Sequence, residues 1–304
     1  MSEAPDRETN DAGFGGVANE ESVALGRHRP RGLIALLIVA AIIVFAWSEV
    51  ILRRDYSAVP ETLPALGAAE KAEAPRLARV LGCLSCHGEG LKGKLMFDAP
   101  GVAKVFAPNL TEVAAKASDQ QLAAGIRQGI GHDGRGLFIM PSPMYSRLTD
   151  KETATLVAWI RTLPPVPGQT RGMRAGPIGR LGLVLGSFRP GPEGVALFRT
   201  QAPIALGSEH EPARHMAATN CAECHGPALM GGSAGPDEKA PDLNVAAGYG
   251  SAQFRTLMKT GRPPSGKDLG LMSEVARNDF SHLTDGEIDA LHAYLVARAK
   301  RLGG

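Results

Sequence analysis

All four cysteines of the 304-residue chain fall in two copies of one short motif, C-x-x-C-H. Two thiols three positions apart lie on one helical turn, where they can form thioether bonds to the two vinyl groups of a haem. The histidine that follows can then ligate the iron. The pattern therefore predicts two covalently attached haem c groups. The predicted attachment and iron-ligating residues are Cys83, Cys86, His87, Cys221, Cys224 and His225.

The positions of the motifs disfavour other functions of paired cysteines. A zinc site built from two C-x-x-C pairs has about 15–20 residues between them, whereas Cys86 and Cys221 are 135 positions apart. A thioredoxin-type redox pair requires a strand–helix–strand context, which neither motif shows. Because no cysteine is left over, a disulfide-stapled scaffold is also excluded.

The composition is that of an ordinary folded protein. Lysine and arginine together number 33 and aspartate and glutamate 31, so the formal net charge is only +2. No basic domain stands out, which argues against nucleic acid as a partner. The 37 glycines and 22 prolines predict many loops, and an aromatic content of 5% leaves core volume that a large apolar cofactor can fill.

An apolar segment near the N-terminus is long enough to cross a membrane. Residues 32–47 form an unbroken apolar run, which continues past Glu49 to position 52. At 1.5 Å per residue, the segment 32–52 spans about 31 Å, close to the thickness of a bilayer core. We therefore predict a transmembrane anchor over 32–52, preceded by a disordered tail over 1–31.

Two alternatives to an anchor stay open. Val44–Ala46 resembles the small-residue site at which a signal peptide is cleaved, and the buried helix of a soluble protein can have a similar composition. The flanking charges do not decide the orientation, because three arginines precede the segment and Arg53 and Arg54 follow it.

The rest of the chain contains a duplicated unit. Three segments recur in the same order after each C-x-x-C-H motif. The matched pairs are 107–111 with 240–244, 125–129 with 257–261, and 148–159 with 283–294. We therefore predict one domain over 68–166, a linker over 167–195 and a second domain over 196–302.

Each unit is predicted to close with a helix that begins at a capping box. Thr149 with Glu152, and Thr284 with Glu287, have the required spacing. Apolar residues at i, i+3 and i+4 follow on one face of each helix.

Two further features carry no assigned chemistry. Leu181–Leu185, within the linker, is too short to span a membrane and is predicted to pack between the domains. Five histidines show no partner pattern and are interpreted as surface or core residues: His28, His210, His215, His282 and His292.

Each half resembles a class I cytochrome c, on its C-x-x-C-H motif and the matched segments that follow it. Over roughly 68–302 the chain resembles a membrane-anchored di-haem cytochrome c, similar to the cytochrome c subunits of bacterial membrane-bound dehydrogenases. The resemblance implies an all-α fold with two tandem class I domains after a transmembrane helix. Because haem is attached outside the bacterial cytoplasm in this family, it also implies a single-pass inner-membrane protein with a cytoplasmic tail and periplasmic haem domains.

The resemblance further implies that a methionine thioether, on a loop before the last helix of each domain, is the second axial ligand. Met140 is the predicted ligand in the first domain, and Met272 in the second. In the first domain Met144, Met96 and His132 stay open as alternatives. In the second, Met258 is predicted to lie in the core, and Met230 is too close to its own motif.

Pro108 and Pro241 resemble the family's proline whose carbonyl oxygen accepts a hydrogen bond from the iron-ligating histidine. Such a bond orients the imidazole ring and raises its basicity. The alternative is that each proline only shapes a turn.

A haem iron with histidine and methionine ligands has no open position for a substrate, so the predicted function is electron transfer in a respiratory chain. The predicted partners are a protein electron donor and a protein acceptor, drawn from dehydrogenases, cytochromes and oxidases. A di-haem peroxidase is the alternative, although the only tryptophans, Trp47 and Trp159, offer no evident residue between the haems. A haem-based sensor is a third possibility.

Overall fold

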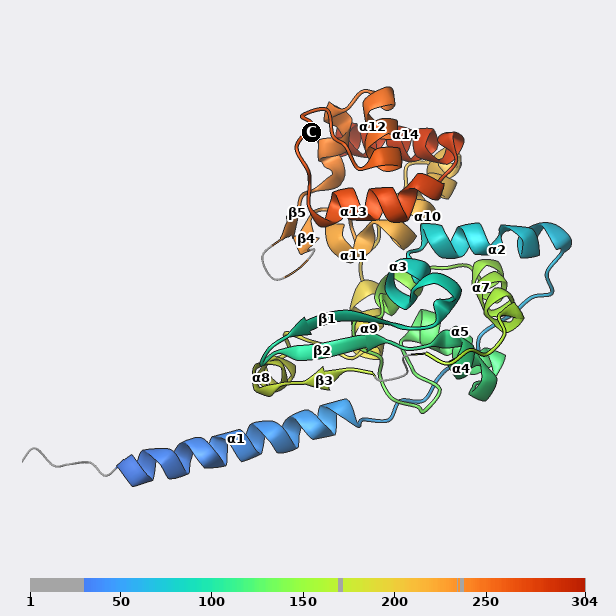
Figure 1. The fold of residues 1–304 in the computed structure, drawn as a ribbon. Helices are drawn as coiled ribbons and strands as arrows, with labels where there is room; N and C mark the ends of the chain where they lie inside the picture. The colour runs from blue at the N-terminus through green and yellow to red at the C-terminus, as the bar shows by residue number, and fades with distance from the viewer. Residues whose placement is uncertain (1–29, 169–171, 234, 236–237, 304) are drawn as a thin grey trace, which may run out of the picture. The chain divides into compact units, whose positions relative to one another are not determined.

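A computed structural model describes residues 30–168, 172–233, 235 and 238–303 (Figure 1). The predicted tail 1–31 lies almost wholly outside the described residues, as does His28. The described chain is mostly helical, which confirms the all-α fold class.

The predicted anchor is a continuous helix, α1 (Pro30–Leu52). Its segment Gly32–Leu52 has a mean hydropathy of 2.6 and is long and apolar enough to cross a membrane. Residues from Ile42 to the C-terminus form one compact unit, to which the last turns of α1 belong.

The first half of the compact unit carries the first C-x-x-C-H motif on a short helix that follows a longer one. Its elements are α2 (Ala68–Val80), α3 (Cys83–His87), η1 (Glu89–Leu91), β1 (Lys94–Ala99), β2 (Ala103–Ala107), α4 (Leu110–Lys116), α5 (Asp119–Gln128), α6 (Ser142–Tyr145) and α7 (Asp150–Thr162).

The second half repeats this order. Its elements are η2 (Ser208–His210), α10 (Glu211–Asn220), α11 (Ala222–His225), β4 (Gly232–Ser233), β5 (Lys239–Ala240), η3 (Leu243–Gly248), α12 (Ser251–Thr260), α13 (Leu271–Asn278), η4 (Phe280–His282) and α14 (Asp285–Leu302). Gly129 and Gly261 end α5 and α12 with φ of 68° and 70°, the left-handed conformation that glycine adopts without strain. Both predicted capping boxes are present, at the starts of α7 and α14.

Short strands occupy segments that the sequence analysis treated as loops. β1 and β2 form an antiparallel hairpin with Ala99 opposite Ala103, and β3 (Arg174–Ala175) pairs with the far edge of β2. In the second half, β4 and β5 form a two-residue antiparallel pair.

The segment 167–195, which is predicted to be a linker, contains regular secondary structure. Besides β3 it contains α8 (Pro177–Val184) and the start of α9 (Gly191–Phe198). The prediction that Leu181–Leu185 packs between the domains is wrong. Leu183 is buried, but Leu181 and Leu185 are 44% and 71% exposed. The glycines of this segment allow α8 to pack against the β1–β2 turn instead.

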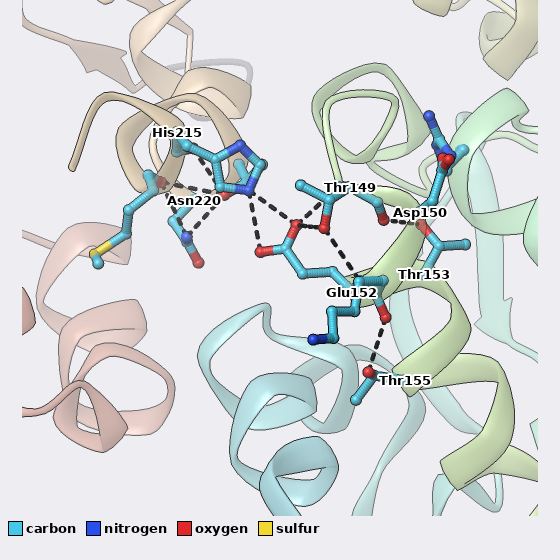
Figure 2. Close-up of polar contacts among 11 residues, drawn as sticks. Thr149, Asp150, Glu152, Thr153, Thr155, His215 and Asn220 are labelled. Atoms are coloured by element: carbon cyan, nitrogen blue, oxygen red, sulfur yellow. Dashed lines mark hydrogen bonds and ion pairs between the residues drawn. The ribbon is translucent and has the colours of Figure 1, made fainter. Parts of the chain in front are cut away.

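The two halves share one apolar core, and their contact is reinforced by a reciprocal pair of ionic contacts. Arg76 on α2 donates two hydrogen bonds of 2.8 Å to the carboxylate of Glu287, the capping residue of α14. His215 on α10 lies 2.9 Å from an oxygen of Glu152, the capping residue of α7 (Figure 2). Each half therefore extends a basic side chain, from the helix before its C-x-x-C-H motif, to the capping glutamate of the other half.

These contacts hold both glutamates in the ionised state. Burial raises the pKa of Glu152, but hydrogen bonds from His215 and Thr149 outweigh that effect, and the net pKa is lowered. Burial and Arg76 act on Glu287 in the same opposed way, and its pKa is also lowered.

A double-mutant cycle can measure the contact between Arg76 and Glu287. Glutamine at position 287 can still form the capping box, so Glu287→Gln removes the charge without removing the cap. Combined with Arg76→Met, it should give a coupling free energy of about 1 kcal/mol in denaturant unfolding, because the pair is bidentate and two-thirds buried. The control is Arg79–Glu89, a more exposed pair within one half, whose arginine also lies on α2. A coupling no larger than in this control would show that the contact does not help to hold the halves together.

Candidate haem sites

Each C-x-x-C-H motif forms a short helical turn that ends at a glycine. Gly82 precedes α3 with φ of 72°, and Gly88 follows it with φ of 75°. Gly226 ends α11 in the same conformation, with φ of 79°. Because these positions lie in the left-handed region, the chain can reverse on leaving each turn while its cysteines and histidine remain on one short helix.

The histidine of each motif makes the predicted hydrogen bond to a proline carbonyl. Nδ1 of His87 lies 2.9 Å from the oxygen of Pro108, and Nδ1 of His225 lies 2.8 Å from that of Pro241. A carbonyl oxygen can only accept, so each Nδ1 must carry the proton. The lone pair of each Nε2 is therefore free to bind a metal ion.

Burial keeps both imidazoles neutral. It lowers the pKa of His87 and His225, and the hydrogen bonds to Pro108 and Pro241 oppose this only in part. A neutral imidazole is the form that ligates iron.

The cysteine thiols are also desolvated. Burial raises the pKa of Cys83 and of Cys221 to about 12, and raises those of Cys86 and Cys224 in the same direction. At neutral pH each sulfur is therefore an uncharged thiol in apolar surroundings, where a thioether fits equally well.

A cavity of about 390 Å³ lies beside the first motif. Cys86, His87 and Met140 line it, together with apolar side chains such as Val105 and Ile126. A narrower cavity of about 40 Å³ is lined by the same three residues and by Cys83 and Trp159. Mostly apolar walls with a few convergent polar groups are typical of cofactor sites, so these residues fit a haem.

Of the candidate axial ligands in the first domain, Met140 shares the most surroundings with the motif. It is half-buried and lines both cavities, whereas Met96 and His132 line only the larger one. Met144 lines neither and is buried in the core on α6. Ile139, immediately before Met140, has φ of 67°, a strained conformation for a β-branched residue and one that clusters at functional sites.

Met272 occupies a different local structure from the one expected. The sequence analysis placed it on a loop, whereas it is the second residue of α13. It is half-buried and packs against the shared core, as Met140 does. Met258 is buried on α12, which confirms that it belongs to the core. Iron ligation by Met140 and Met272 stays a prediction.

Comparison with known proteins identifies the family. The sequence model of the family described as cytochrome c matches residues 72–164 and 211–298, more than half of the chain. The chain belongs to the cytochrome c family. Each matched segment contains one C-x-x-C-H motif, so this is a tandem cytochrome c. Family membership supports covalently bound haem c.

A dehydrogenase subunit is among its relatives. The fructose dehydrogenase cytochrome subunit of Gluconobacter japonicus is 24% identical over an alignment of 250 residues, which covers 72% of this chain and 50% of the relative. The cytochrome thus spans about half the length of the relative that it matches.

The zinc alternative has no geometric support in this cytochrome. Among the residues that the structure describes, no three histidine, cysteine, aspartate or glutamate side chains are grouped so as to hold a metal ion.

Sequence reasoning missed a buried ion pair that supports the second site. Arg298 is fully buried, and its guanidinium donates to Asp242 at 2.8 Å, to Asn244 at 2.6 Å and to the carbonyl of Ala228 at 3.1 Å. Asp242 directly follows Pro241, so the pair fixes the loop that holds His225. The available signal was the position of Arg298, four residues after Tyr294 on the apolar face of its helix.

Sequence reasoning also missed a carboxylate that the second half brings to the first motif. Asp279 is buried, accepts a hydrogen bond from Ser85 and lies against Gly82. Burial raises its pKa to about 6, although the hydrogen bond from Ser85 opposes the rise. Asp279 therefore gains its charge near neutral pH, beside the turn that carries Cys83 and Cys86.

Replacing Arg298 should destabilise the second half. Arg298→Met leaves Asp242, the side chain of Asn244 and the carbonyl of Ala228, all half-buried, without their donor, which should cost about 2–4 kcal/mol in denaturant unfolding. Arg301→Met, at an exposed position on the same helix, is the matched control. Equal stability of the two variants would contradict the role assigned to the pair.

Asp279 should make the reduction potential of the first haem pH-dependent. As pH rises through about 6 the carboxylate becomes negative and favours the ferric state, so the potential should fall. If the charged carboxylate stabilises ferric iron by on the order of 1 kcal/mol, the reduction potential should fall by about 40 mV for one electron. Asp279→Asn should abolish this step in a spectroelectrochemical titration. Asp268→Asn, at an exposed site, should keep it, and a step that persists in Asp279→Asn would refute the assignment.

Proposed function

We propose that this cytochrome c carries two haem c groups and transfers electrons at the periplasmic face of the bacterial inner membrane, as the cytochrome subunit of a dehydrogenase complex. The observation that carries the proposal is the repeated site. Each half has a buried histidine with its Nδ1 proton committed to a proline carbonyl and its Nε2 free. Bound haem would supply the one-electron couple between ferric and ferrous iron.

The residues of the chain would hold and insulate the redox centres. Cys83 and Cys86, and likewise Cys221 and Cys224, would provide the thioether bonds. His87 with Met140, and His225 with Met272, would ligate the iron of each haem. If both residues of each pair bind, no ligand position would be left for a substrate, and the apolar lining of the first site would exclude water. These features describe a carrier and not a catalytic subunit.

The contact between the halves supports transfer from one site to the other. Arg76 and His215 tie each half to the other, and Ser85, two residues before His87, contacts Asp279 of the second half. Such contacts keep the two sites in one arrangement between docking events. The electron donor would be a dehydrogenase, as the similarity to a dehydrogenase subunit suggests, and the acceptor a cytochrome or an oxidase.

The helix α1 would keep this electron transfer at the membrane surface. We infer that residues 32–52 form a single-pass anchor, with residues 53–304 in the periplasm and the N-terminal tail in the cytoplasm. Its length and hydropathy support a membrane span, and the orientation rests on the family's attachment of haem outside the cytoplasm. Cleavage of the segment as a signal peptide would instead release the cytochrome, and N-terminal sequencing of the purified protein separates the two outcomes.

Spectroscopy distinguishes a carrier from a peroxidase or a sensor. The full-length protein, produced with the haem attachment machinery, should show two low-spin haems and a thioether-to-iron charge-transfer band. Neither carbon monoxide nor peroxide should change the spectra. Binding at one haem, or turnover of peroxide, would refute the carrier assignment in favour of an enzyme or a sensor.

Removing each predicted methionine ligand should open one haem at a time. Met140→Ala should allow carbon monoxide to bind the first haem and Met272→Ala the second, and each change should lower the potential of its own haem, because the thioether favours ferrous iron. Carbon monoxide difference spectra measure the fraction of haem that binds. Met230→Ala, at a position 66% exposed, is the control and should bind none. A Met140→Ala or Met272→Ala protein that behaves like this control would show that another residue is the ligand.

A further inference from the structure

The short helix α8 presents an apolar face that no part of the described chain covers. Ile178, Leu181 and Leu185 follow one another at spacings of three and four residues, so they lie on one side of the helix. Their exposures are 62%, 44% and 71%. On the other side, Gly179 and Leu183 are buried. The helix is therefore attached to the protein by one face and has its larger side chains on the other.

Backbone contacts fix α8 against the turn between β1 and β2. The amides of Gly176 and Ile178 donate to the carbonyls of Val102 and Gly101, at 2.8 and 2.9 Å. Gly179 lies so close to Val102 that an added Cβ would come within 2.1 Å of its carbonyl oxygen. The orientation of the exposed face is therefore set by the fold.

Arg180 joins α8 to the last turns of α1. Its guanidinium donates to Ser48 at 2.8 Å and to Glu49 at 2.7 Å, and lies 4.2 Å from the centroid of the Phe45 ring. All three partners belong to the apolar segment 32–52 near its C-terminal end. The helix α8 is thus tied, through Arg180, to the end of the predicted anchor.

The segment around α8 carries a positive charge. Residues 172–192 include three arginines and no acidic residue. Arg174 and Arg189 are exposed, on either side of the helix in the chain. An apolar helical face flanked by arginines is the pattern of a segment that lies in the interface of an anionic bilayer.

We propose that α8 is a second membrane contact, which lies in the interface of the same leaflet in which α1 ends and is favoured by anionic phospholipid headgroups. The inference rests on the proposed anchor. In this arrangement Ile178, Leu181 and Leu185 enter the boundary of the acyl chains, and Arg174 and Arg189 meet the headgroups. The first haem domain is then held at one height and orientation above the bilayer.

Photo-crosslinking to lipid tests the contact. The full-length haem-loaded protein is placed in nanodiscs of phosphatidylglycerol and phosphatidylcholine that contain a diazirine-bearing phospholipid, and labelled peptides are mapped by mass spectrometry. Label is expected in 32–52 and in 177–185. Met230 and Leu302 are exposed apolar residues of the second half and serve as internal controls that should remain unlabelled.

The outcomes separate failure of this inference from failure of the anchor. Label in 32–52, with 177–185 no more labelled than Met230, would overturn the second contact and leave the anchor standing. Absence of label from 32–52 would refute the anchor and this inference with it. Equal label of 177–185 in discs of phosphatidylcholine alone would refute the role of anionic headgroups.

A charged variant gives a second readout. Leu181→Glu with Leu185→Glu should reduce label in 177–185 by about tenfold or more, because two large apolar side chains no longer favour the interface. Label in 32–52 and the haem spectra should be unchanged, since both leucines are exposed. Met230→Glu is the matched control and should alter neither label. Undiminished label in the double variant would overturn the proposal.

Discussion

The hydrogen bond from each motif histidine to a proline carbonyl is the constraint on which the rest of the structure depends. It decides which ring nitrogen carries the proton, and hence which is free to bind iron. It also requires that a loop far along the chain, at Pro108 or Pro241, returns to the C-x-x-C-H turn. Much of the surrounding structure holds these loops. Asn109 is buried directly after Pro108 and caps α4, and Arg298 binds Asp242 directly after Pro241.

The local and repeated features could be predicted from the sequence because they follow from residue type and spacing. The C-x-x-C-H turns, the capping boxes and the apolar span belong to this class, whereas the two proline contacts were implied by the resemblance to class I cytochromes c. The β1–β2 hairpin was missed because both strands are short and β1 is mostly exposed, so the pair gives no sustained alternation of polar and apolar residues. Met272 was expected on a loop because the residues around it carry no signal for the start of a helix, although α13 begins one residue earlier.

Contacts between the halves could not be predicted from the sequence, for a different reason. Asp279 lies beside Ser85, and His215 beside Glu152, only because two domains distant in sequence pack together. No spacing along one chain encodes such a pairing. His215 therefore looked like an ordinary surface residue. Leu181–Leu185 was assigned to the interface between the domains on its hydrophobicity alone, yet it lies against the hairpin turn and the end of α1.

The reciprocal use of Glu152 and Glu287 has the form of an isologous contact, in which one patch serves on both sides of a twofold axis. In a true homodimer the two sides must be identical, and any change in one is made in both. Joining the halves in one chain removes that restriction. One glutamate faces the guanidinium of an arginine, and the other faces the imidazole of a histidine. The duplicated chain can therefore hold the two sides of one symmetric joint with different basic groups, and each side can change without the other.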